Sequence, residues 1–221
     1  MTERERCDLD HLVVTTPVLA DGVAWVESIL GVTLQAGGEH QGMATHNALI
    51  RLGDSTYLEV IAPNPEAMRP DRPRWFELDR VKDGELSRLA TWVARTADVN
   101  GTVAQCNAEF GQIEPMSRGT LNWLIAVPFE GALIAGGIIP MLVQWSAEGH
   151  PATGLQDKGC VLKRLELFHP EIGFVVDTLE CLGLRDDARI RPMSTKGRPF
   201  LVAVIDTPRG PRSIGGLLKA T

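Results

Sequence analysis

The sequence lacks the excess of positive charge that nucleic acids and anionic membranes attract. Its 221 residues include 22 lysines and arginines against 28 aspartates and glutamates, a formal net charge of −6. A mildly acidic chain offers no electrostatic footprint for a phosphate backbone or for a negatively charged lipid surface. We therefore expect no nucleic acid and no membrane among its partners.

Cysteine motifs are absent as well. The four cysteines stand far apart, with no CxxC or CxxH spacing, which argues against a zinc knuckle and against a redox motif. We expect reduced and mostly buried thiols, because free cysteine behaves as a small hydrophobic side chain. The four residues are Cys7, Cys106, Cys160 and Cys181.

Long hydrophobic runs are missing too. The longest uncharged run, from Gly131 to Trp145, contains three glycines and a proline. It falls short of the roughly 20 residues that cross a bilayer. The N-terminal residues are charged where a secretory signal needs an apolar segment. These absences predict a cytoplasmic protein, and a hydrophobic content of 44% is ample for a packed core.

The sequence does contain a repeated order of elements. Residues 9–16 alternate and are rich in β-branched side chains, so they predict a strand that Pro17 ends. A helix follows, with Asp21 as its expected N-cap and Gly31 after its last turn. Three further strands, VTLQA, HNALIRL and TYLEVIA, complete a β-α-β-β-β unit.

The same order returns twice. Residues 89–96 predict a strand, a helix ends at Gly111, and IEPMSRG, TLNWLIAVP and PMLVQW predict three more strands. A third copy opens at VLKRLELFHP, and its helix ends at Gly183. The residues that match between the first and third copies are Cys7 with Cys160, Leu9 with Leu162, Leu12 with Leu165 and Pro17 with Pro170.

These repeats predict an α+β protein of tandem βαβββ modules with a third, degenerate βαββ copy. Each one-sided sheet needs a partner, so we expect one compact unit. Prolines between residues 63 and 74 exclude both helix and central strand from that connector. The expected boundaries are 1–62 and 89–146 for the two modules, 160–221 for the degenerate copy, and 63–88 and 147–159 for the connectors.

Six motifs occur in a recognisable order: LDHLVV, THNALIRLGDSTYLEVIAP, RPRWFELD, PMSRGTLNWLIAVP, PMLVQW and HPA. With them the chain resembles the bacterial glyoxalase-like domain family of the vicinal-oxygen-chelate superfamily, which also holds extradiol dioxygenases and bleomycin-resistance proteins. The resemblance implies paired βαβββ modules with a small-molecule ligand in a cup between them. It implies a monomer or a homodimer, and a divalent metal such as zinc, nickel, manganese or iron, unless the metal chemistry has been lost.

In that superfamily one residue from the first strand and one from the last strand of each module hold the metal. In the first module these positions are His11 and Glu59. In the second module they fall on Thr91, a poor ligand, and on Gln144, a weak one. The resemblance therefore implies a metal held by His11, Glu59 and Gln144. The third copy has Arg164 and Ala203 at these positions, so we expect it to buttress the sheet without binding metal.

Other polar and aromatic residues are candidates for binding a substrate. If the turn around Gly53 has an even length, His46 shares a face with Glu59. Arg95 and Arg118 could each hold a substrate carboxylate through a bidentate contact.

The remaining candidates line or flank the cup. Trp123 and Trp145 are expected to form an apolar wall, and His150 in the turn-like GHPA segment is expected to pack on the module junction and could reach the ligand. His40 and His169 are expected at the surface or at element ends.

Three possibilities remain open for the function of the cup. A metal-dependent enzyme of glyoxalase or dioxygenase type, with Glu59 as its catalytic carboxylate, is favoured by His11 and Glu59. A metal-free protein that sequesters a small molecule is favoured by Thr91 and Gln144. A structural or regulatory module with a self-filled cup is the third possibility.

Overall fold

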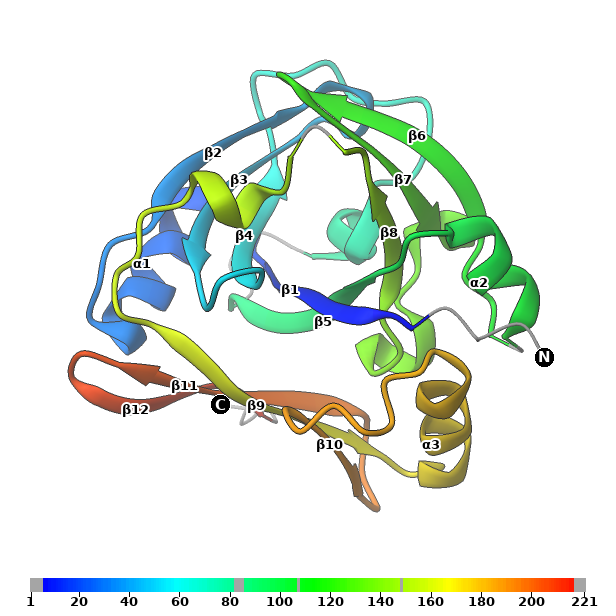
Figure 1. Cartoon of the computed structure of the whole chain (residues 1–221). Coiled ribbons are helices and arrows are strands. Elements are labelled where there is room, and N and C mark those ends of the chain that lie inside the picture. Colours follow the sequence, from blue (N-terminus) through cyan, green and yellow to red (C-terminus); the bar gives the residue numbers. More distant parts are fainter. Residues whose placement is uncertain (1–5, 82–85, 107, 148, 217–221) are drawn as a thin grey trace.

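A curled eight-stranded sheet forms a cup and carries a separate four-stranded sheet on its outer side (Figure 1). The computed structural model describes residues 6–81, 86–106, 108–147 and 149–216. The outer ends of the predicted units, residues 1–5 and 217–221, lie outside this description. The α+β fold class predicted from the repeats is confirmed, with few helices on a largely β framework.

The first module supplies one half of the cup. Its helix begins at Leu19, two residues before the expected cap Asp21, which lies in the first turn where a carboxylate favours the helix dipole. The helix ends at Gly31, whose φ of 72° needs a glycine. The elements are β1 (Asp8–Thr15), α1 (Leu19–Leu30), β2 (Gln35–His40), β3 (Thr45–Arg51) and β4 (Tyr57–Pro63).

The second module supplies the other half in the same order. Asp98 caps its helix by accepting a hydrogen bond from the Gly101 N–H at 3.0 Å. This helix ends at Gln105, well before the predicted end at Gly111. The elements are β5 (Arg88–Arg95), α2 (Val99–Gln105), β6 (Gln112–Arg118), β7 (Leu121–Val127) and β8 (Met141–Trp145).

The two modules join through their first strands. β1 runs antiparallel to β5 and parallel to β4, and β5 in turn runs parallel to β8. The order of strands in the sheet is β2-β3-β4-β1-β5-β8-β7-β6. The sheet curls until its two edge strands face each other. Arg118 at the end of β6 reaches His40 at the end of β2, with 3.2 Å between the guanidinium Nη1 and the imidazole Nε2. The cup is therefore nearly closed on itself.

The third unit repeats the order of elements without repeating the sheet. Its strands are ordered β10-β9-β11-β12, so β10 lies directly beside β9, whereas β2 lies at the far edge from β1. Three strands follow its helix, one more than the sequence indicated. The elements are β9 (Val161–His169), α3 (Ile172–Cys181), β10 (Ile190–Ser194), β11 (Phe200–Thr207) and β12 (Gly210–Gly215).

Two hydrophobic cores lie on opposite sides of the large sheet. The outer core joins the convex face, with Leu12 and Trp92, to the helices and to third-unit residues such as Leu165 and Ala203. The four-stranded sheet of the third unit thus packs against the back of the cup (Figure 1). The inner core fills part of the concave side and contains Val13, Ile61, Trp75, Phe76, Val93, Trp123, Met141 and Val143.

A disulfide links the second module to the third unit. Cys106 at the end of α2 bonds to Cys181 at the end of α3, across 75 residues of sequence. The expectation of reduced thiols is therefore wrong for these two residues, because only the packing brings the two helix ends together. Cys7 and Cys160 are buried, as expected. A disulfide is unusual in a reducing compartment, so the cytoplasmic location stays a prediction.

No helix in the described ranges is long and apolar enough to cross a membrane.

Candidate functional site

A small cavity opens on the concave side of the cup, with a volume of about 30 Å³. That is room for roughly one to three water molecules. Its polar lining comes mainly from the first module, and its apolar lining mainly from the second module and the connector. The lining residues are His11, His40, Asn47, Leu49, Tyr57, Glu59, Trp75, Phe76, Arg118, Trp123, Ile125, Val143 and Trp145.

A fully buried carboxylate, Asp10, organises one side of this cavity. The pairing of β1 with β5 is irregular between Leu9 and His11. Asp10 and His11 both reach the site there, 2.6 Å apart between Oδ1 and Nδ1. The second oxygen, Oδ2, accepts hydrogen bonds from Trp145 Nε1 and His150 Nε2, each at 2.9 Å. Burial alone would raise the pKa of Asp10, but the hydrogen bonds from His11 and His150 outweigh it and hold the pKa well below its usual range.

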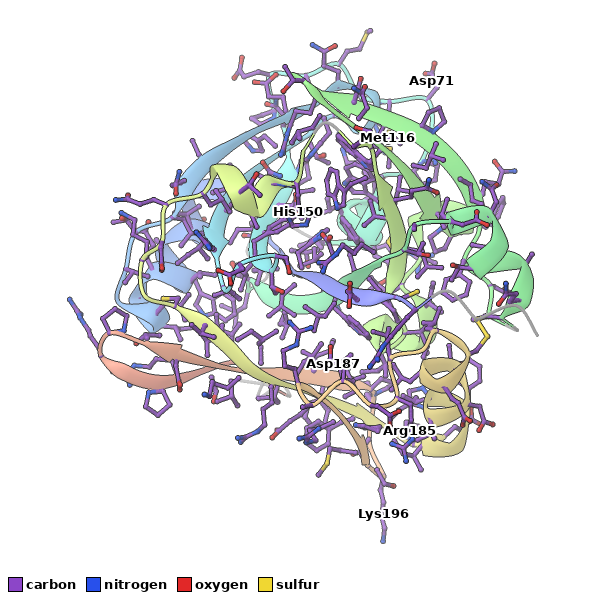
Figure 2. All side chains as sticks on the ribbon, viewed as in Figure 1. Asp71, Met116, His150, Arg185, Asp187 and Lys196 are labelled. Carbon is purple, nitrogen blue, oxygen red and sulfur yellow. A yellow bond between two sulfur atoms is a disulfide. The ribbon has the colours of Figure 1, made fainter. Side chains whose placement is uncertain are left out.

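An ionised Asp10 fixes the tautomers of both histidines. A carboxylate only accepts, so His11 carries its proton on Nδ1 and its Nε2 is left facing Glu59. His150 Nδ1 accepts from the Ala152 N–H at 3.2 Å, so its proton is on Nε2. His150, labelled in Figure 2, caps the short η5 turn (Pro151–Gly154) and extends to β1 from there.

Glu59 faces His11 across the floor of the cavity. Its Oε2 lies 3.6 Å from His11 Nε2, and its Oε1 accepts a short hydrogen bond from the Asn47 side-chain amide. The His11 ring stacks on Tyr57 with 4.5 Å between ring centroids. Burial, with the nearby charges of Asp10 and Glu59, raises the pKa of Tyr57, so the phenol stays neutral.

The mouth of the cavity holds Arg118. Its Nη1 donates to His40 Nε2 and to Asn47 Oδ1, each at 3.2 Å. His40 therefore carries its proton on Nδ1, which donates to Thr45 Oγ1 at 3.1 Å. Burial lowers the pKa of His40 to about 4, with Glu59 opposing and Arg118 adding to the shift. Both acceptors of Arg118 are neutral, and no carboxylate in the described ranges pairs with it, so its charge is available to an anion.

The expectation that Gln144 shares this cavity is wrong. Its Oε1 accepts from the Val99 N–H at 3.0 Å, on the helix side of the sheet. Val143 and Trp145 face the cavity instead, because alternate residues of a strand point to opposite faces. Laying Tyr57–Ile61 directly on Met141–Trp145 puts Val143, not Gln144, opposite Glu59. A one-residue slip had moved the whole strand to the wrong face.

The strand pairings show which second-module residues correspond to the candidate ligands. His11 pairs with Tyr57 in β1–β4, and Val93 pairs with Met141 in the equivalent β5–β8. Val93 is therefore the counterpart of His11, and Thr91 is not. Thr91 donates to the Gly137 carbonyl at 3.0 Å.

The prediction that His46 shares the face of Glu59 is also wrong. β3 and β4 pair Leu49 with Glu59 and Arg51 with Tyr57, so residues 52–56 form a connection of odd length. Odd-numbered residues of β3 then share the face of Glu59, and Asn47 lines the cavity in place of His46. The prediction assumed an even number of residues between the two strands.

Arg95 does not line the cavity either. It donates to the Ser55 carbonyl at 2.9 Å and to Asp8 Oδ2 at 3.1 Å, which ties β5 to β1 and to the β3–β4 turn. His150 acts on the site through Asp10 and does not line it. Of the candidates, the structure brings His11, Glu59, Arg118, Trp123 and Trp145 together in one cavity.

Several residues of the site were not predicted from the sequence. His40, expected at a surface or an element end, is buried and lies beside Arg118. An acid next to His11 in the DLDH segment was the available signal for Asp10. No local signal marked Trp75 and Phe76, which arrive from the connector. The residues that had not been proposed are Asp10, His40, Asn47, Tyr57, Trp75 and Phe76.

The donor set does not fit a four-ligand metal site. Within the described part of the chain, no three histidine, cysteine, aspartate or glutamate side chains are grouped to hold a metal ion. His11 and Glu59 have valines as their counterparts in the second module. The Nε2 of His40, a further nitrogen at the cavity, accepts from Arg118. We therefore derive no chemical step through a metal.

Comparison with known proteins gives one family and a shared fold. The model of the glyoxalase-like domain matches residues 9–183. A hypothetical protein from Staphylococcus aureus is similar in structure, with a TM-score of 0.58, 14% identity and 87% of each chain covered. No curated protein matches significantly.

Two more distant structures match with lower scores. Methylmalonyl-CoA epimerase from Mycobacterium tuberculosis has a TM-score of 0.39 and 16% identity, covering 62% of this chain and 85% of its own. The hypothetical protein BH1468 from Bacillus halodurans C-125 has a TM-score of 0.41 and 12% identity, covering 65% and 96%. At 14% identity, the Staphylococcus aureus structure shows a shared fold and nothing more.

Proposed function

Because the chain belongs to the glyoxalase-like domain family of the vicinal-oxygen-chelate superfamily, we propose that its cup binds a small organic anion and moves a proton on it without a metal. One observation carries this proposal. His11 donates from Nδ1 to the buried, ionised Asp10, which leaves its Nε2 on the cavity side, 3.6 Å from Glu59. A histidine oriented by a carboxylate in this way is a competent general base.

Arg118 is the proposed anion-binding group. Its guanidinium lines the cavity and its only described hydrogen bonds go to neutral acceptors. A guanidinium matches a carboxylate in shape and charge, and a hydrogen bond between two charged groups is about twice as strong as a neutral one. An anion at Arg118 would leave the rest of the molecule pointing toward His11.

The proton transfer needs an acidic C–H beside a carbonyl or carboxylate. His11 Nε2 takes this proton, and the electron pair of the broken C–H bond moves into the carbonyl group. The negative oxygen that forms faces Arg118, and Asp10 stabilises the imidazolium. Return of the proton to the same or a neighbouring carbon completes an exchange or an isomerisation. Glu59, 3.6 Å from His11 Nε2, orients the imidazolium while it holds the proton.

A metal-free binding protein without chemistry is the alternative, because the counterparts of His11 and Glu59 in the second module are valines. The small cavity and the internal pairing of Glu59 with Asn47 and of Arg118 with His40 favour instead a structural module with a self-filled cup. The metal-dependent glyoxalase or dioxygenase has less support, because the second module supplies Val93 and Val143 where further ligands are needed.

Small carboxylates in D₂O distinguish these functions. Acetate, pyruvate, malonate and benzoate are titrated into the protein by calorimetry, and deuterium uptake into pyruvate and malonate is followed by NMR. We expect at least one saturable ligand and deuterium uptake faster than the buffer rate. Arg118→Gln should lose binding, and His11→Gln should bind the carboxylate without exchanging its proton. The control Arg164→Gln, in the third unit, should bind and exchange as the wild type does.

Two results would change this conclusion. If the wild type binds a carboxylate but catalyses no deuterium exchange, the protein is a binding protein and not an enzyme. No binding of any carboxylate at millimolar concentration would remove the anion site altogether.

A further inference from the structure

Trp75 has a buried hydrogen-bond donor that the protein leaves unused. Its side chain is 3% exposed and lines the cavity, yet its indole Nε1–H has no acceptor in the described part of the chain. Other tryptophans are paired: Trp92 Nε1 donates to the Ile138 carbonyl at 2.8 Å, and Trp145 Nε1 donates to Asp10 at 2.9 Å. Buried donors without a partner are rare because they lose their hydration without replacement.

The backbone that presents Trp75 is strained. Trp75 opens the short η2 turn (Trp75–Arg80), in which Phe76 and Glu77 have φ of 58° and 55°. Two successive non-glycine residues in the left-handed region persist only where their surroundings hold them, and such residues cluster at functional sites. Asp79 holds this turn by accepting from the Arg74 N–H at 2.7 Å and by pairing with the Arg74 guanidinium.

The indole lies beside the proposed anion site. Its ring meets His40 edge-on, with 5.1 Å between centroids, and His40 is the residue that Arg118 contacts. Trp75 and Arg118 therefore approach the same cavity from different elements, the connector and β6. Neither an apolar core role nor the hydrogen bonds of the fold accounts for the free N–H.

We propose that the Trp75 Nε1–H is the second hydrogen-bond donor for the ligand, so that the cup takes an anion with an oxygen acceptor for each of Arg118 and Trp75. This inference rests on the proposed function, which it deepens by adding a recognition group. Trp75 is a binding residue in this arrangement, and the strained η2 turn is the support that holds it at the cavity.

Indole N–H signals of the ¹⁵N-labelled protein test the donor directly. The Trp75→Phe variant assigns its signal, and pyruvate or malonate, whichever binds more tightly, is the probe. We expect the Trp75 signal to move downfield on binding while the Trp92 signal stays in place. We also expect Trp75→Phe to bind the probe about tenfold more weakly, and Trp92→Phe to bind it as the wild type does. A bound probe that leaves the Trp75 signal and the affinity of Trp75→Phe unchanged would overturn the inference.

A ligand-free measurement separates this inference from the proposed function. Both phenylalanine variants lose the same ring atoms, but only Trp92→Phe also breaks a hydrogen bond. We therefore expect the smaller loss in urea unfolding midpoint for Trp75→Phe, and an equal or larger loss would show that its N–H is structurally paired. If the wild type binds no carboxylate while Trp75→Phe shows the smaller loss, the proposed function fails and the free donor stands.

Discussion

In the first half of the cup, the strand positions that face the cavity hold His11 and Glu59, and in the second half their counterparts are Val93 and Val143. His11 and Val93 pair directly across the β1–β5 junction, so the two halves meet with different side chains at equivalent strand positions. In the proposed function, the first half supplies the proton-transfer residues and the second half supplies mainly apolar walls. Two copies of one fold can thus share an order of elements while only one of them has ionisable side chains at the equivalent positions.

Making the two halves alike should change the protein most, because it should create a metal site. Val93→His with Val143→Glu gives the second half the donors of the first and completes a four-ligand set. We expect the variant to bind about one equivalent of zinc or nickel at micromolar concentration, at least about a thousandfold tighter than the wild type. Calorimetry measures the affinity, with circular dichroism to confirm folding.

The matched control uses positions on the same two strands that do not line the cavity. Thr91→His with Gln144→Glu introduces the same donors at one residue that bonds the Gly137 carbonyl and at one on the helix side of the sheet. It should bind no more metal than the wild type. Stoichiometric metal binding by the wild type at micromolar concentration would show instead that the two halves do not differ in the way described.

Asp10→Asn tests how much the buried carboxylate of Asp10 contributes to the stability of the first half of the cup. Asp10 accepts from His11, Trp145 and His150, and an amide cannot accept from all three. We expect the free energy of unfolding to fall by about 2–4 kcal/mol. Because the native pKa of Asp10 lies below its unfolded value of about 4, its contribution is present above that pH and is lost as the pH falls through the native pKa.

Urea unfolding from pH 7 to pH 3 measures this contribution. The variant should have a flatter acid limb than the wild type. Asp8→Asn, which removes an exposed neighbouring carboxylate, is the control and should leave the acid limb unchanged. Equal acid limbs in wild type and Asp10→Asn would mean that Asp10 is not ionised in the folded protein.

His40, at the edge of the cup, should make the stability of the protein depend on pH. Its native pKa of about 4 is below the unfolded value of 6.5, so folding favours the neutral ring. Its stabilisation is complete above pH 6.5 and is lost as the pH falls toward 4. We expect His40→Gln to reduce the loss of stability over this range by about 2 kcal/mol. His46→Gln, on the outer face, should reduce it less, and the opposite ranking would contradict the burial argument.

Gln144→Ala should have the smallest effect. It removes one hydrogen bond to the Val99 N–H on the helix side, so we expect a loss of about 1 kcal/mol in stability and no change in carboxylate affinity. Trp145→Phe, one residue further along β8, should weaken binding because it removes a donor to Asp10. A weaker carboxylate affinity in Gln144→Ala would show instead that Gln144 acts on the cavity.

Much of the framework follows from local patterns in the sequence. Alternation over 9–16, a proline after it and a glycine at Gly31 define a strand and a helix through forces that act between neighbours along the chain. The repeat of that order predicted the paired modules. The prediction is poorer in the third unit, where the structure has one strand more than predicted. The order of its strands depends on pairing between distant segments.

Tertiary structure decided the face on which each candidate lies. A strand alternates with a period of two, so one residue of error in aligning β8, or one residue in the β3–β4 connection, exchanges Gln144 for Val143 and His46 for Asn47. No local pattern contains that information, because it is fixed when the strands pair.

The sequence by itself determined the family, the modular order and the candidates His11, Glu59 and Arg118, since each is legible in a short motif. Only the folded chain could place Asp10 between two histidines, join Cys106 to Cys181 and bring Trp75 from the connector into the cup. The physical reason is that contacts such as the disulfide, across 75 residues, and the bond from His150 to Asp10, across 140 residues, join distant segments. Their geometry is set by the closing of the sheet and the packing of its two cores.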